Sequence, residues 1–234
     1  NLGGLRDAVL AAGCAVGFAQ DPDADRLVLC DETGTLLSEE LTLALCLRAI
    51  LRKTPGAIVI NLSTSNRSED AALATGSVTL RSKVGEANVS NAMREHGAIA
   101  GGEGGGGVIW PTVNFARDSY VGIALVLELM AQENKPLSAI VAALPSWEMV
   151  KEKIPFSGNL TTAFDGLATL FHEASANRSD GIRLDFPDRS WVHIRASNTE
   201  PVVRVIAEAT TKDAAADLTR KAKNFLESYP TRND

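Results

Sequence analysis

The first part of the chain alternates between short apolar runs and longer stretches in which apolar residues recur every three or four positions. The short runs have the length of strands and are expected at residues 15–19, 26–30, 57–62, 77–80 and 98–101. The longer stretches predict helices at residues 5–12, 39–52, 87–96 and 117–132, with one further short helix before residue 77. This alternation is typical of a doubly wound α/β domain.

The pattern changes around residues 133–136, where the sequence turns polar. Beyond this point strands and helices no longer alternate regularly. A hairpin is expected from residues 182–186 and 191–196, followed by a strand at 202–209 and a charged amphipathic helix at 212–228. We therefore expect a smaller α+β part after the α/β part.

The charge balance excludes some classes of partner. The 234 residues include 23 basic and 29 acidic side chains, which gives a formal net charge of -6. Such a chain has no broad positive field for nucleic acid or an anionic membrane, so neither is expected as a partner. The longest apolar stretch, residues 121–127, is far shorter than the roughly 20 residues that cross a bilayer. With no secretory signal either, the cytoplasm is the default location.

Cysteine spacing and the start of the chain add two expectations. Cys14, Cys30 and Cys46 are odd in number and form no C-x-x-C pair, which favours reduced, mostly buried thiols over disulfides or a zinc site. The chain begins at Asn1 rather than methionine, with the pattern of a helix that leads into a strand. We expect a fragment of a longer protein.

The loop between the first two expected strands concentrates negative charge. Asp21, Asp23 and Asp25 place three carboxylates within five residues, and these would repel one another unless a cation neutralised them. Mg²⁺ is suited to this because it accepts a few carboxylate oxygens and keeps other positions for water or phosphate. The next residue, Arg26, could hold a phosphate oxygen.

Two other interpretations of this loop remain. One is an acidic turn exposed to solvent. The other is the calcium loop of an EF-hand, whose first, third, fifth and twelfth positions would be Asp21, Asp23, Asp25 and Glu32. The sixth position of such a loop requires glycine but is Arg26 here, and the flanking segments are expected to be strands rather than helices.

A glycine-rich segment follows the strand expected at residues 98–101. Residues 101–107 contain six glycines around Glu103. Glycine permits backbone conformations closed to other residues and lets a ligand approach the main chain. The carboxylate of Glu103 could accept hydrogen bonds from two vicinal hydroxyls of a sugar. A flexible hairpin loop is the alternative.

Two further segments carry groups suited to phosphate. Residues 195–201 combine a guanidinium, hydroxyls, an amide and backbone N–H groups in a turn, a combination suited to an anion, although an ordinary turn with a surface arginine is the alternative. Lys83 lies between a strand and a helix and could neutralise a phosphate or exchange a proton. The alternative is a solvated lysine.

Together and in this order, these segments resemble the α-D-phosphohexomutases, the family of phosphoglucomutase, phosphomannomutase and phosphoglucosamine mutase. The family's D-G-D-G-D-R-like metal loop is matched at the aspartates and arginine, with Pro22 and Ala24 in the spacer positions. Its sugar loop, G-E-x-N-G-G, is matched at Gly102, Glu103, Gly106 and Gly107, whereas Gly105 replaces the serine or asparagine. Its phosphate loop, R-x-S-N-T-E-P, is matched throughout residues 195–201. Residues 83–86 are similar to the family's K-x-G-[EDH] stretch.

The resemblance implies a fold: a mixed-sheet α/β domain of phosphohexomutase type followed by a smaller α+β C-terminal domain. Residues 1–38 would be the end of a truncated second α/β domain that carries the metal loop. Residues 39–140 would be the third domain, with the sugar loop, and residues 141–234 the fourth, phosphate-binding domain. The family's catalytic phosphoserine lies in a loop resembling T-A-S-H-N-P, and no such loop occurs in this sequence.

The resemblance also implies an activity. The whole protein would interconvert hexose 1-phosphate and hexose 6-phosphate through a phosphoserine and a hexose 1,6-bisphosphate, while this chain would be inactive alone. A non-catalytic sugar-phosphate-binding protein is the alternative. The glycine-ended sugar loop favours glucosamine or a mixed glucose and mannose specificity, and the oligomeric state is not predicted.

The roles implied by the resemblance fall on three sets of residues. The metal ligands for Mg²⁺ would be Asp21, Asp23 and Asp25. The catalytic residues would be Arg26 and Lys83. The substrate-binding residues would be Gly102, Glu103, Gly106, Arg195, Ser197, Asn198 and Thr199.

Overall fold

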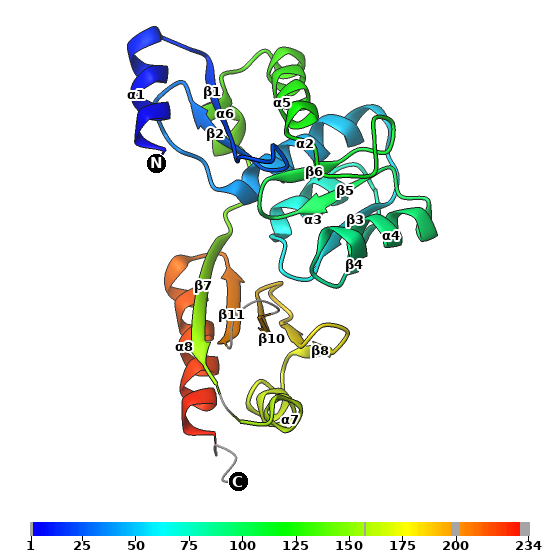
Figure 1. Cartoon of the computed structure of the whole chain (residues 1–234), viewed down its shortest axis with the longest axis vertical. Coiled ribbons are helices and arrows are strands. Elements are labelled where there is room, and N and C mark those ends of the chain that lie inside the picture. Colours follow the sequence, from blue (N-terminus) through cyan, green and yellow to red (C-terminus); the bar gives the residue numbers. More distant parts are fainter. Residues whose placement is uncertain (1, 157, 198–201, 230–234) are drawn as a thin grey trace. The chain divides into compact units, whose positions relative to one another are not determined.

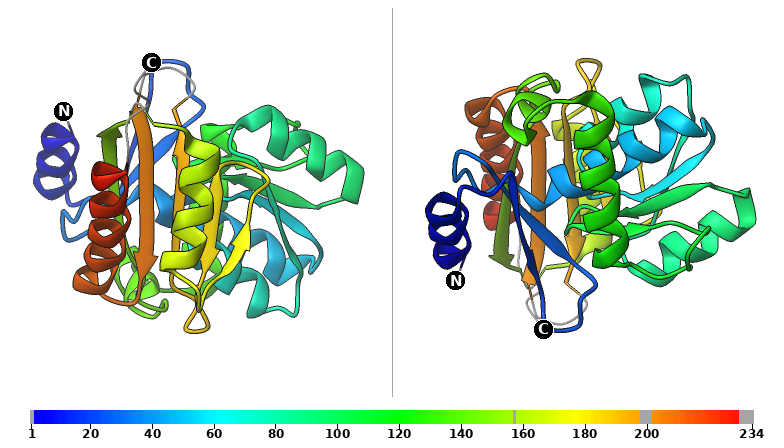
Figure 2. Two further views of the ribbon diagram at one scale, coloured as in Figure 1. Left: turned by 90° about the horizontal axis from the view of Figure 1, so that it is seen from below. Right: turned by 90° about the horizontal axis from the view of Figure 1, so that it is seen from above.

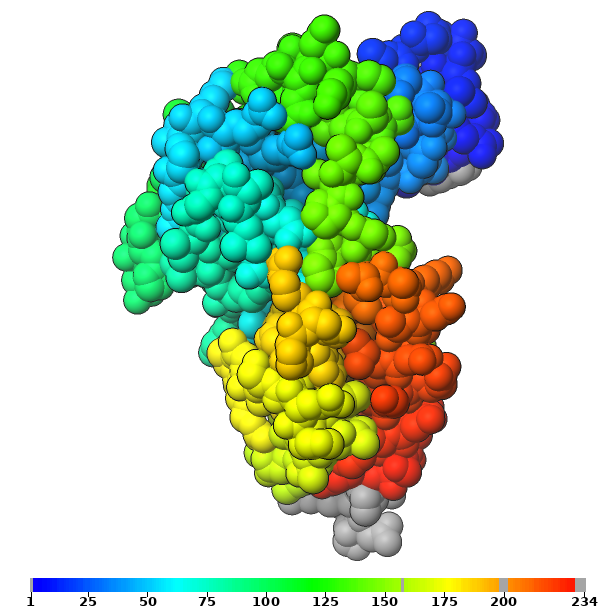
Figure 3. Space-filling view, turned by 180° about the vertical axis from the view of Figure 1, so that it is seen from behind, coloured from blue at the N-terminus to red at the C-terminus, as the bar shows by residue number. Residues whose placement is uncertain are grey.

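The computed structural model describes residues 2–156, 158–197 and 202–229. The chain divides into two compact units, Asn1–Pro145 and Ser146–Asp234. Figure 1 labels most of their helices and strands. Figure 3 shows the units in space-filling form, the first in blue to green and the second in yellow-green to red. Each unit has its own hydrophobic core.

The first unit begins with a helix and a hairpin. These elements are α1 (Gly3–Ala12), β1 (Val16–Gln20) and β2 (Leu27–Asp31). The strands pair antiparallel, so that Val16 lies opposite Asp31 and Gln20 opposite Leu27. Gly13 ends the helix in the left-handed conformation, at φ 61°. The acidic loop connects two strands, as the sequence predicted, and the structure shows that these strands pair as a hairpin.

A four-stranded mixed sheet forms the centre of this unit. Its strands are β3 (Ile58–Asn61), β4 (Thr79–Ser82), β5 (Ala100–Glu103) and β6 (Gly107–Ile109), in the spatial order β4-β3-β5-β6. β3 is parallel to both β4 and β5, whereas β6 is antiparallel to β5. The glycine-rich segment is thus the turn between β5 and β6, and the sequence analysis did not predict β6.

Helices cover both faces of this sheet. They are α2 (Glu39–Lys53), α3 (Asn66–Leu73), α4 (Glu86–His96), α5 (Ser119–Glu133) and α6 (Leu137–Ala142). Ile58 and Ile60 lie in the core that includes α2 and α5, whereas Val59, between them in the strand, packs with α4. Because successive side chains of a strand point to opposite faces, this alternation gives an α/β/α sandwich.

The second unit is an α+β module. Its elements are β7 (Glu148–Pro155), α7 (Leu160–Leu170), β8 (Ser175–Asn177), β9 (Ile182–Asp185), β10 (Trp191–Ala196), β11 (Val202–Ala209) and α8 (Lys212–Ser228). The strands form an antiparallel sheet in the order β7-β11-β10-β9-β8, and the left view of Figure 2 shows α7 and α8 on one face of it. The mixed-sheet α/β unit followed by this module confirms the predicted fold class.

The sequence analysis did not predict β7, α7 or β8. β7 is a largely polar edge strand that pairs with β11 over eight residues, from Glu148 opposite Ala209 to Pro155 opposite Val202. Edge strands often carry charged side chains, which removes the alternating apolar pattern that reveals a strand. Among the described residues, none of the helices has the length and apolar content that a bilayer span requires.

The three thiols are free, and only Cys14 is exposed. Burial raises the pKa of the Cys46 thiol to about 12, so almost no thiolate is present near neutral pH. We expect iodoacetamide at pH 8 to alkylate Cys14 in the native chain, and to reach Cys30 and Cys46 only after unfolding. Peptide mass spectrometry measures this, and modification of native Cys46 as fast as Cys14 would contradict the described core.

Candidate functional site

The hairpin loop gathers its three aspartates. One carboxylate oxygen from each of Asp21, Asp23 and Asp25 lies within 4.8 Å of the others. Oδ1 of Asp21 accepts hydrogen bonds from the backbone N–H groups of Asp25, at 3.1 Å, and Arg26, at 3.0 Å. Ala24 adopts the left-handed conformation at φ 57°, which glycine adopts most easily and which accounts for the glycine in the family pattern at this position.

The electrostatic surroundings of the aspartates differ. Burial acts to raise the pKa of Asp21, but hydrogen bonds, above all from the Arg26 N–H, outweigh it and lower the pKa. Burial raises the pKa of Asp25; the charge of Arg117 opposes this, while Asp21 and Asp23 add to it. Oδ1 of Asp25 is buried and has no hydrogen-bond partner among the described residues. A further cation would satisfy this oxygen.

Arg26 lies beside the loop with much of its side chain in solvent. Its Nε is 3.8 Å from Oδ2 of Asp21 and 3.7 Å from Oδ1 of Asp25, and 53% of the side-chain surface is exposed. These are ion pairs rather than close hydrogen bonds. The guanidinium therefore remains accessible to an anion.

Glu103 lies at the edge of the sheet where the parallel strands end. Its Oε1 accepts hydrogen bonds from Nδ2 of Asn61 and from the N–H of Gly85, both at 2.8 Å. Asn61 ends β3, and its register partner Ser82 ends β4, just before Lys83, which is exposed. The carboxyl edge of parallel strands is where ligands bind in open α/β sheets.

Arg117 joins this edge to the acidic loop. Its guanidinium contacts the carboxylates of Asp25, of Glu86 at 3.0 Å and of Glu103 at 3.4 Å, and only 12% of its side chain is exposed. Burial acts to lower the pKa of Arg117, but the hydrogen bond with Glu86 and the three carboxylates outweigh it, so the pKa is raised. The sequence analysis missed Arg117 and Asn61, since neither belongs to a local motif.

Packing accounts for several glycines of the sugar loop. A side chain at Gly102 would lie 2.2 Å from the carbonyl of Gly107, and one at Gly106 would lie 2.5 Å from the carbonyl of Leu27. Both glycines also have positive φ, 154° and 87°. At Gly104 a Cβ would lie 2.0 Å from Oε2 of the buried Glu40. Close backbone packing, rather than loop flexibility, therefore explains these three positions.

Gly105 is the exception in this loop. An added Cβ there would meet only the Arg26 side chain, at 3.9 Å. This is the position where the family pattern has serine or asparagine, so the structure leaves room for such a side chain beside the acidic loop. The departure from the pattern removes a side chain that the fold could accommodate.

In the second unit, Arg195 lies near the end of β10. It is 8% exposed, and its Nη1 donates to the carbonyl of Ala196 at 3.2 Å. The N–H of Ser197 donates to the carbonyl of Val202 at 2.8 Å, which closes the base of the loop. Asn198 and Thr199, also predicted to bind substrate, lie outside the described residues.

Arg204 is a second guanidinium in this sheet that the sequence analysis missed. It lies in β11 directly opposite Arg195. Like charges opposite each other on neighbouring strands are destabilising unless an anion lies nearby. The signal in the sequence was a single arginine within the apolar run of residues 202–209, which alone predicts only a strand.

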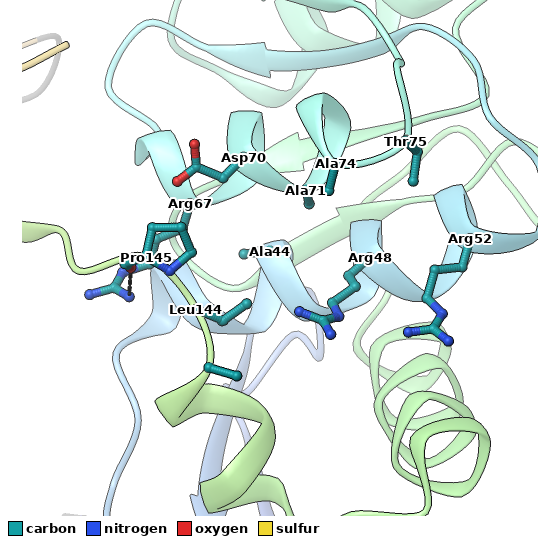
Figure 4. Close-up of a pocket in the computed structure, with 11 residues that line it drawn as sticks. Ala44, Arg48, Arg52, Arg67, Asp70, Ala71, Ala74, Thr75, Leu144 and Pro145 are labelled. Atoms are coloured by element: carbon teal, nitrogen blue, oxygen red, sulfur yellow. Dashed lines mark hydrogen bonds between the residues drawn. The ribbon is translucent and has the colours of Figure 1, made fainter. Parts of the chain in front are cut away.

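A separate cavity of about 360 Å³ lies between α2, α3 and residues 143–145 (Figure 4). Arg48, Arg52 and Arg67 line it, but none of the predicted site residues does. Arg48 and Arg52 both pair with Oε1 of Glu133, at 2.6 and 2.8 Å. These ion pairs connect α2 to α5, and Nη1 of Arg67 donates to the carbonyl of Pro145 at 3.1 Å, so each of these arginines has a structural explanation.

Comparison with known proteins assigns the chain to a family. Residues 38–147 match the model for phosphoglucomutase/phosphomannomutase, alpha/beta/alpha domain III, and residues 150–224 match the model for the C-terminal domain of the same family. The chain is 34% identical over 230 residues to the phosphoglucomutase/phosphomannomutase of Thermococcus kodakarensis. The matched region covers 97% of this chain and 50% of that relative. It is also 34% identical over 222 residues to a probable phosphoglucosamine mutase of Methanopyrus kandleri, and that match covers 93% of this chain and 49% of the relative.

Solved structures agree with these matches. A phosphoglucomutase/phosphomannomutase family protein from Burkholderia thailandensis superposes with a TM-score of 0.84 at 27% identity, over 97% of this chain and 50% of that one. The N-acetylphosphoglucosamine mutase of Aspergillus fumigatus, solved with GlcNAc-6P and magnesium, shares the fold at a TM-score of 0.58 and 17% identity. This likeness covers 89% of this chain and 48% of the fungal chain.

The fold and these matches define an enzyme class, the sugar-phosphate mutases, which are isomerases. The chain belongs to the phosphoglucomutase/phosphomannomutase family. It spans about half the length of the curated relatives that it matches.

The acidic loop generates a first prediction. We expect Asp23→Asn to weaken Mg²⁺ binding to this chain at least tenfold, about 1.4 kcal/mol, because it removes one of three clustered carboxylates. Asp23 is exposed, so folding should be unaffected. Calorimetric titration measures the affinity, with Asp7→Asn on the exposed face of α1 as the matched control. Equal Mg²⁺ affinity in both variants would contradict the metal site, and a preference for Ca²⁺ would favour the EF-hand interpretation.

The packing of the sugar loop generates a second prediction. We expect Gly104→Ala to lower the free energy of unfolding by about 1–3 kcal/mol, because the added methyl group overlaps the Glu40 carboxylate. The neighbouring Gly105→Ala is the control and should change it by less than about 0.5 kcal/mol. Urea unfolding of both variants measures the difference. Equal stability would show that the loop does not pack on Glu40 as described.

Proposed function

We propose that the protein is a phosphohexomutase, which interconverts hexose 1-phosphate and hexose 6-phosphate through a phosphoserine and a hexose 1,6-bisphosphate. The observation that carries this proposal is the junction of the three-aspartate loop with Glu103 through Arg117. Family membership supports it, because the relatives are named as mutases of glucose, mannose and glucosamine phosphates.

The residues of the acidic loop suit Mg²⁺. Asp21, Asp23 and Asp25 offer three oxygens close together, and the buried Oδ1 of Asp25 has no hydrogen-bond partner among the described residues. When bound, the ion supplies positive charge that neutralises phosphoryl oxygens. Magnesium in the solved fungal mutase supports this choice of metal.

Arg26 and Lys83 would act on the transferred phosphoryl group. Phosphoryl transfer depends mainly on alignment and charge neutralisation. The half-exposed guanidinium of Arg26 would hold a phosphoryl oxygen next to the aspartates. The exposed ammonium of Lys83, at the carboxyl edge of the sheet, would neutralise a phosphate oxygen or exchange a proton with the reacting hydroxyl.

The remaining predicted residues would bind the substrate. The Glu103 carboxylate would accept hydrogen bonds from sugar hydroxyls, and Gly102 and Gly106 would give the loop its close backbone path. In the second unit, Arg195, together with Ser197, Asn198 and Thr199, would hold the phosphate that is not reacting. Arg204, directly opposite Arg195, would add a second positive charge to that site.

The nucleophile would come from the half of the relatives that this chain does not match. No T-A-S-H-N-P-like loop occurs in the sequence, and the chain spans about half of each relative. We propose that residues 1–38 end the second domain, that residues 39–140 form the third and that residues 141–234 form the fourth. The family-model matches at residues 38–147 and 150–224 support this division.

Gly105 favours a second candidate function and bears on the choice of hexose. A sugar-phosphate-binding protein derived from a mutase, without catalysis, could lose the side chain that the family pattern has at this open position. The glycine-ended loop leads us to propose glucosamine phosphate, or both glucose and mannose phosphates, as substrates. Turnover by the whole gene product would exclude the binding protein.

These proposals predict how activity is distributed. With Mg²⁺ and glucose 1,6-bisphosphate, we expect the whole gene product to isomerise at least one of glucose, mannose or glucosamine 1-phosphate in a coupled assay. We expect the purified 234-residue chain to show no turnover, because it lacks the serine loop. Turnover by this chain would contradict our placement of the nucleophile.

Arg195 provides the test of the phosphate site. In the whole gene product, Arg195→Gln should raise KM for the hexose phosphate about 10- to 100-fold, because a hydrogen bond to a charged group contributes about 1.5–3 kcal/mol. Arg189→Gln, in the turn between β9 and β10, is the control. An unchanged KM for the Arg195 variant would argue against the assignment.

A further inference from the structure

We propose that Arg117 is a positioning residue that couples the metal loop to the sugar-binding carboxylate. This inference rests on the proposed function, because it concerns the same metal and sugar sites. Arg117 would hold Asp25 and Glu103 at a fixed separation and set the affinity of the aspartates for a cation. Loss of its side chain should therefore have opposite effects on the two ligands.

The contacts of Arg117 reach three separate elements. Nη2 bonds Asp25 in the β1–β2 loop, Nη1 lies 3.4 Å from Oε2 of Glu103 at the end of β5, and Nε bonds Oε2 of Glu86 in the first turn of α4 at 3.0 Å. The Arg117 backbone N–H also donates to Oε1 of Glu86 at 3.2 Å. A guanidinium has its donors in a rigid planar fork, so one side chain fixes three carboxylates relative to one another.

The charges explain why this contact affects metal binding. Arg117 bonds Oδ2 of Asp25, while Oδ1 of the same carboxylate is buried and has no hydrogen-bond partner among the described residues. Arg117 therefore leaves the Oδ1 oxygen of Asp25 available to a cation bound by the three aspartates. Its positive charge also opposes a second cation at that oxygen, and such repulsion is strong over a few ångströms in a partly buried site.

The bonds of Glu103 explain why the same contact affects the sugar. An ionised carboxylate has about four lone-pair sites, and Glu103 already accepts from Asn61 and Gly85 through Oε1 and pairs with Arg117 through Oε2. Oε2 is thus the oxygen with remaining capacity for a sugar hydroxyl. Its 3.4 Å contact with Arg117 keeps it oriented.

Gly107 provides a second way to disturb the same contact. The Cβ of any residue at 107 would lie 2.3 Å from Cδ of Arg117, so the arginine stem occupies the space that glycine leaves. Gly107→Ala would therefore displace the guanidinium without removing its charge. The glycine that ends the sugar motif has this structural reason in addition to any direct role with a ligand.

The experiment measures two affinities in the 234-residue chain: Mg²⁺ by calorimetry, and glucose 6-phosphate or glucosamine 6-phosphate by NMR titration with Mg²⁺ present. For Arg117→Met we expect Mg²⁺ to bind at least about threefold more tightly, because a nearby positive charge is lost. We expect the sugar phosphate to bind at least about tenfold more weakly, because Glu103 loses its orienting partner.

Other variants separate charge from geometry. Arg117→Lys keeps the charge but loses the planar fork, so Mg²⁺ affinity should stay near that of the unaltered chain while sugar phosphate binding weakens. Gly107→Ala shifts the fork, and it should also weaken sugar phosphate binding. Arg48→Met is the matched control, because it removes a guanidinium from an ion pair with Glu133 outside the site. It should lower thermal stability and leave both affinities unchanged.

The outcomes distinguish this inference from the proposed function. If Arg117→Met lowers the affinities for Mg²⁺ and for the sugar phosphate together with thermal stability, or changes neither affinity, Arg117 is only structural. The coupling is then wrong, whereas the mutase proposal stands. If the unaltered chain binds neither Mg²⁺ nor either sugar phosphate, both proposals fail. If Mg²⁺ affinity rises while sugar phosphate affinity falls, the coupling is supported.

Discussion

Repulsion among carboxylates is the constraint on which the site depends. Asp21, Asp23 and Asp25 share one loop, and Glu86 and Glu103 approach it through their common contact with Arg117. Among the described contacts of this cluster, the positive charge comes from Arg117, whose side chain is 12% exposed, and the half-exposed Arg26. Five carboxylates against two guanidiniums leave negative charge in a partly buried place, an arrangement that a bound divalent cation would stabilise.

The sheet positions the groups that surround this charge. Because β3, β4 and β5 are parallel, their carboxyl ends bring Asn61, Lys83 and Glu103 to one edge, and the N–H of Gly85 fixes the Glu103 carboxylate there. The hairpin loop is held from another direction. The N–H and hydroxyl of Ser119, at the start of α5, both donate to the carbonyl of Ala24, and Gln20 donates to the same hydroxyl.

The two units carry two kinds of charged cluster. The first carries the aspartates and the sugar-loop carboxylate, where charge must be neutralised. The second carries Arg195 and Arg204 opposite each other in an antiparallel sheet, so that two guanidinium-bearing residues are neighbours. Family membership connects these sites, since the two matched models belong to one family and follow each other along the chain. A reaction in which a phosphate-bearing substrate has both ends recognised would use both kinds of site.

The sequence by itself determined the fold class, most of the strands and helices of the first unit, the last strands and helix of the second, and the family. It could do so because burial periodicity, helix caps and turns are local, and because the motifs at residues 21–26, 102–107 and 195–201 are contiguous. The tertiary structure alone identified Arg117, Asn61 and Arg204, which matter through partners elsewhere in the chain; Arg117 and Asp25 are 92 residues apart. It also decided that β7, a polar edge strand, pairs with β11, and that packing requires most of the glycines of residues 101–107. Side-chain contacts between distant segments leave no periodic trace in a sequence, so only the folded chain shows them.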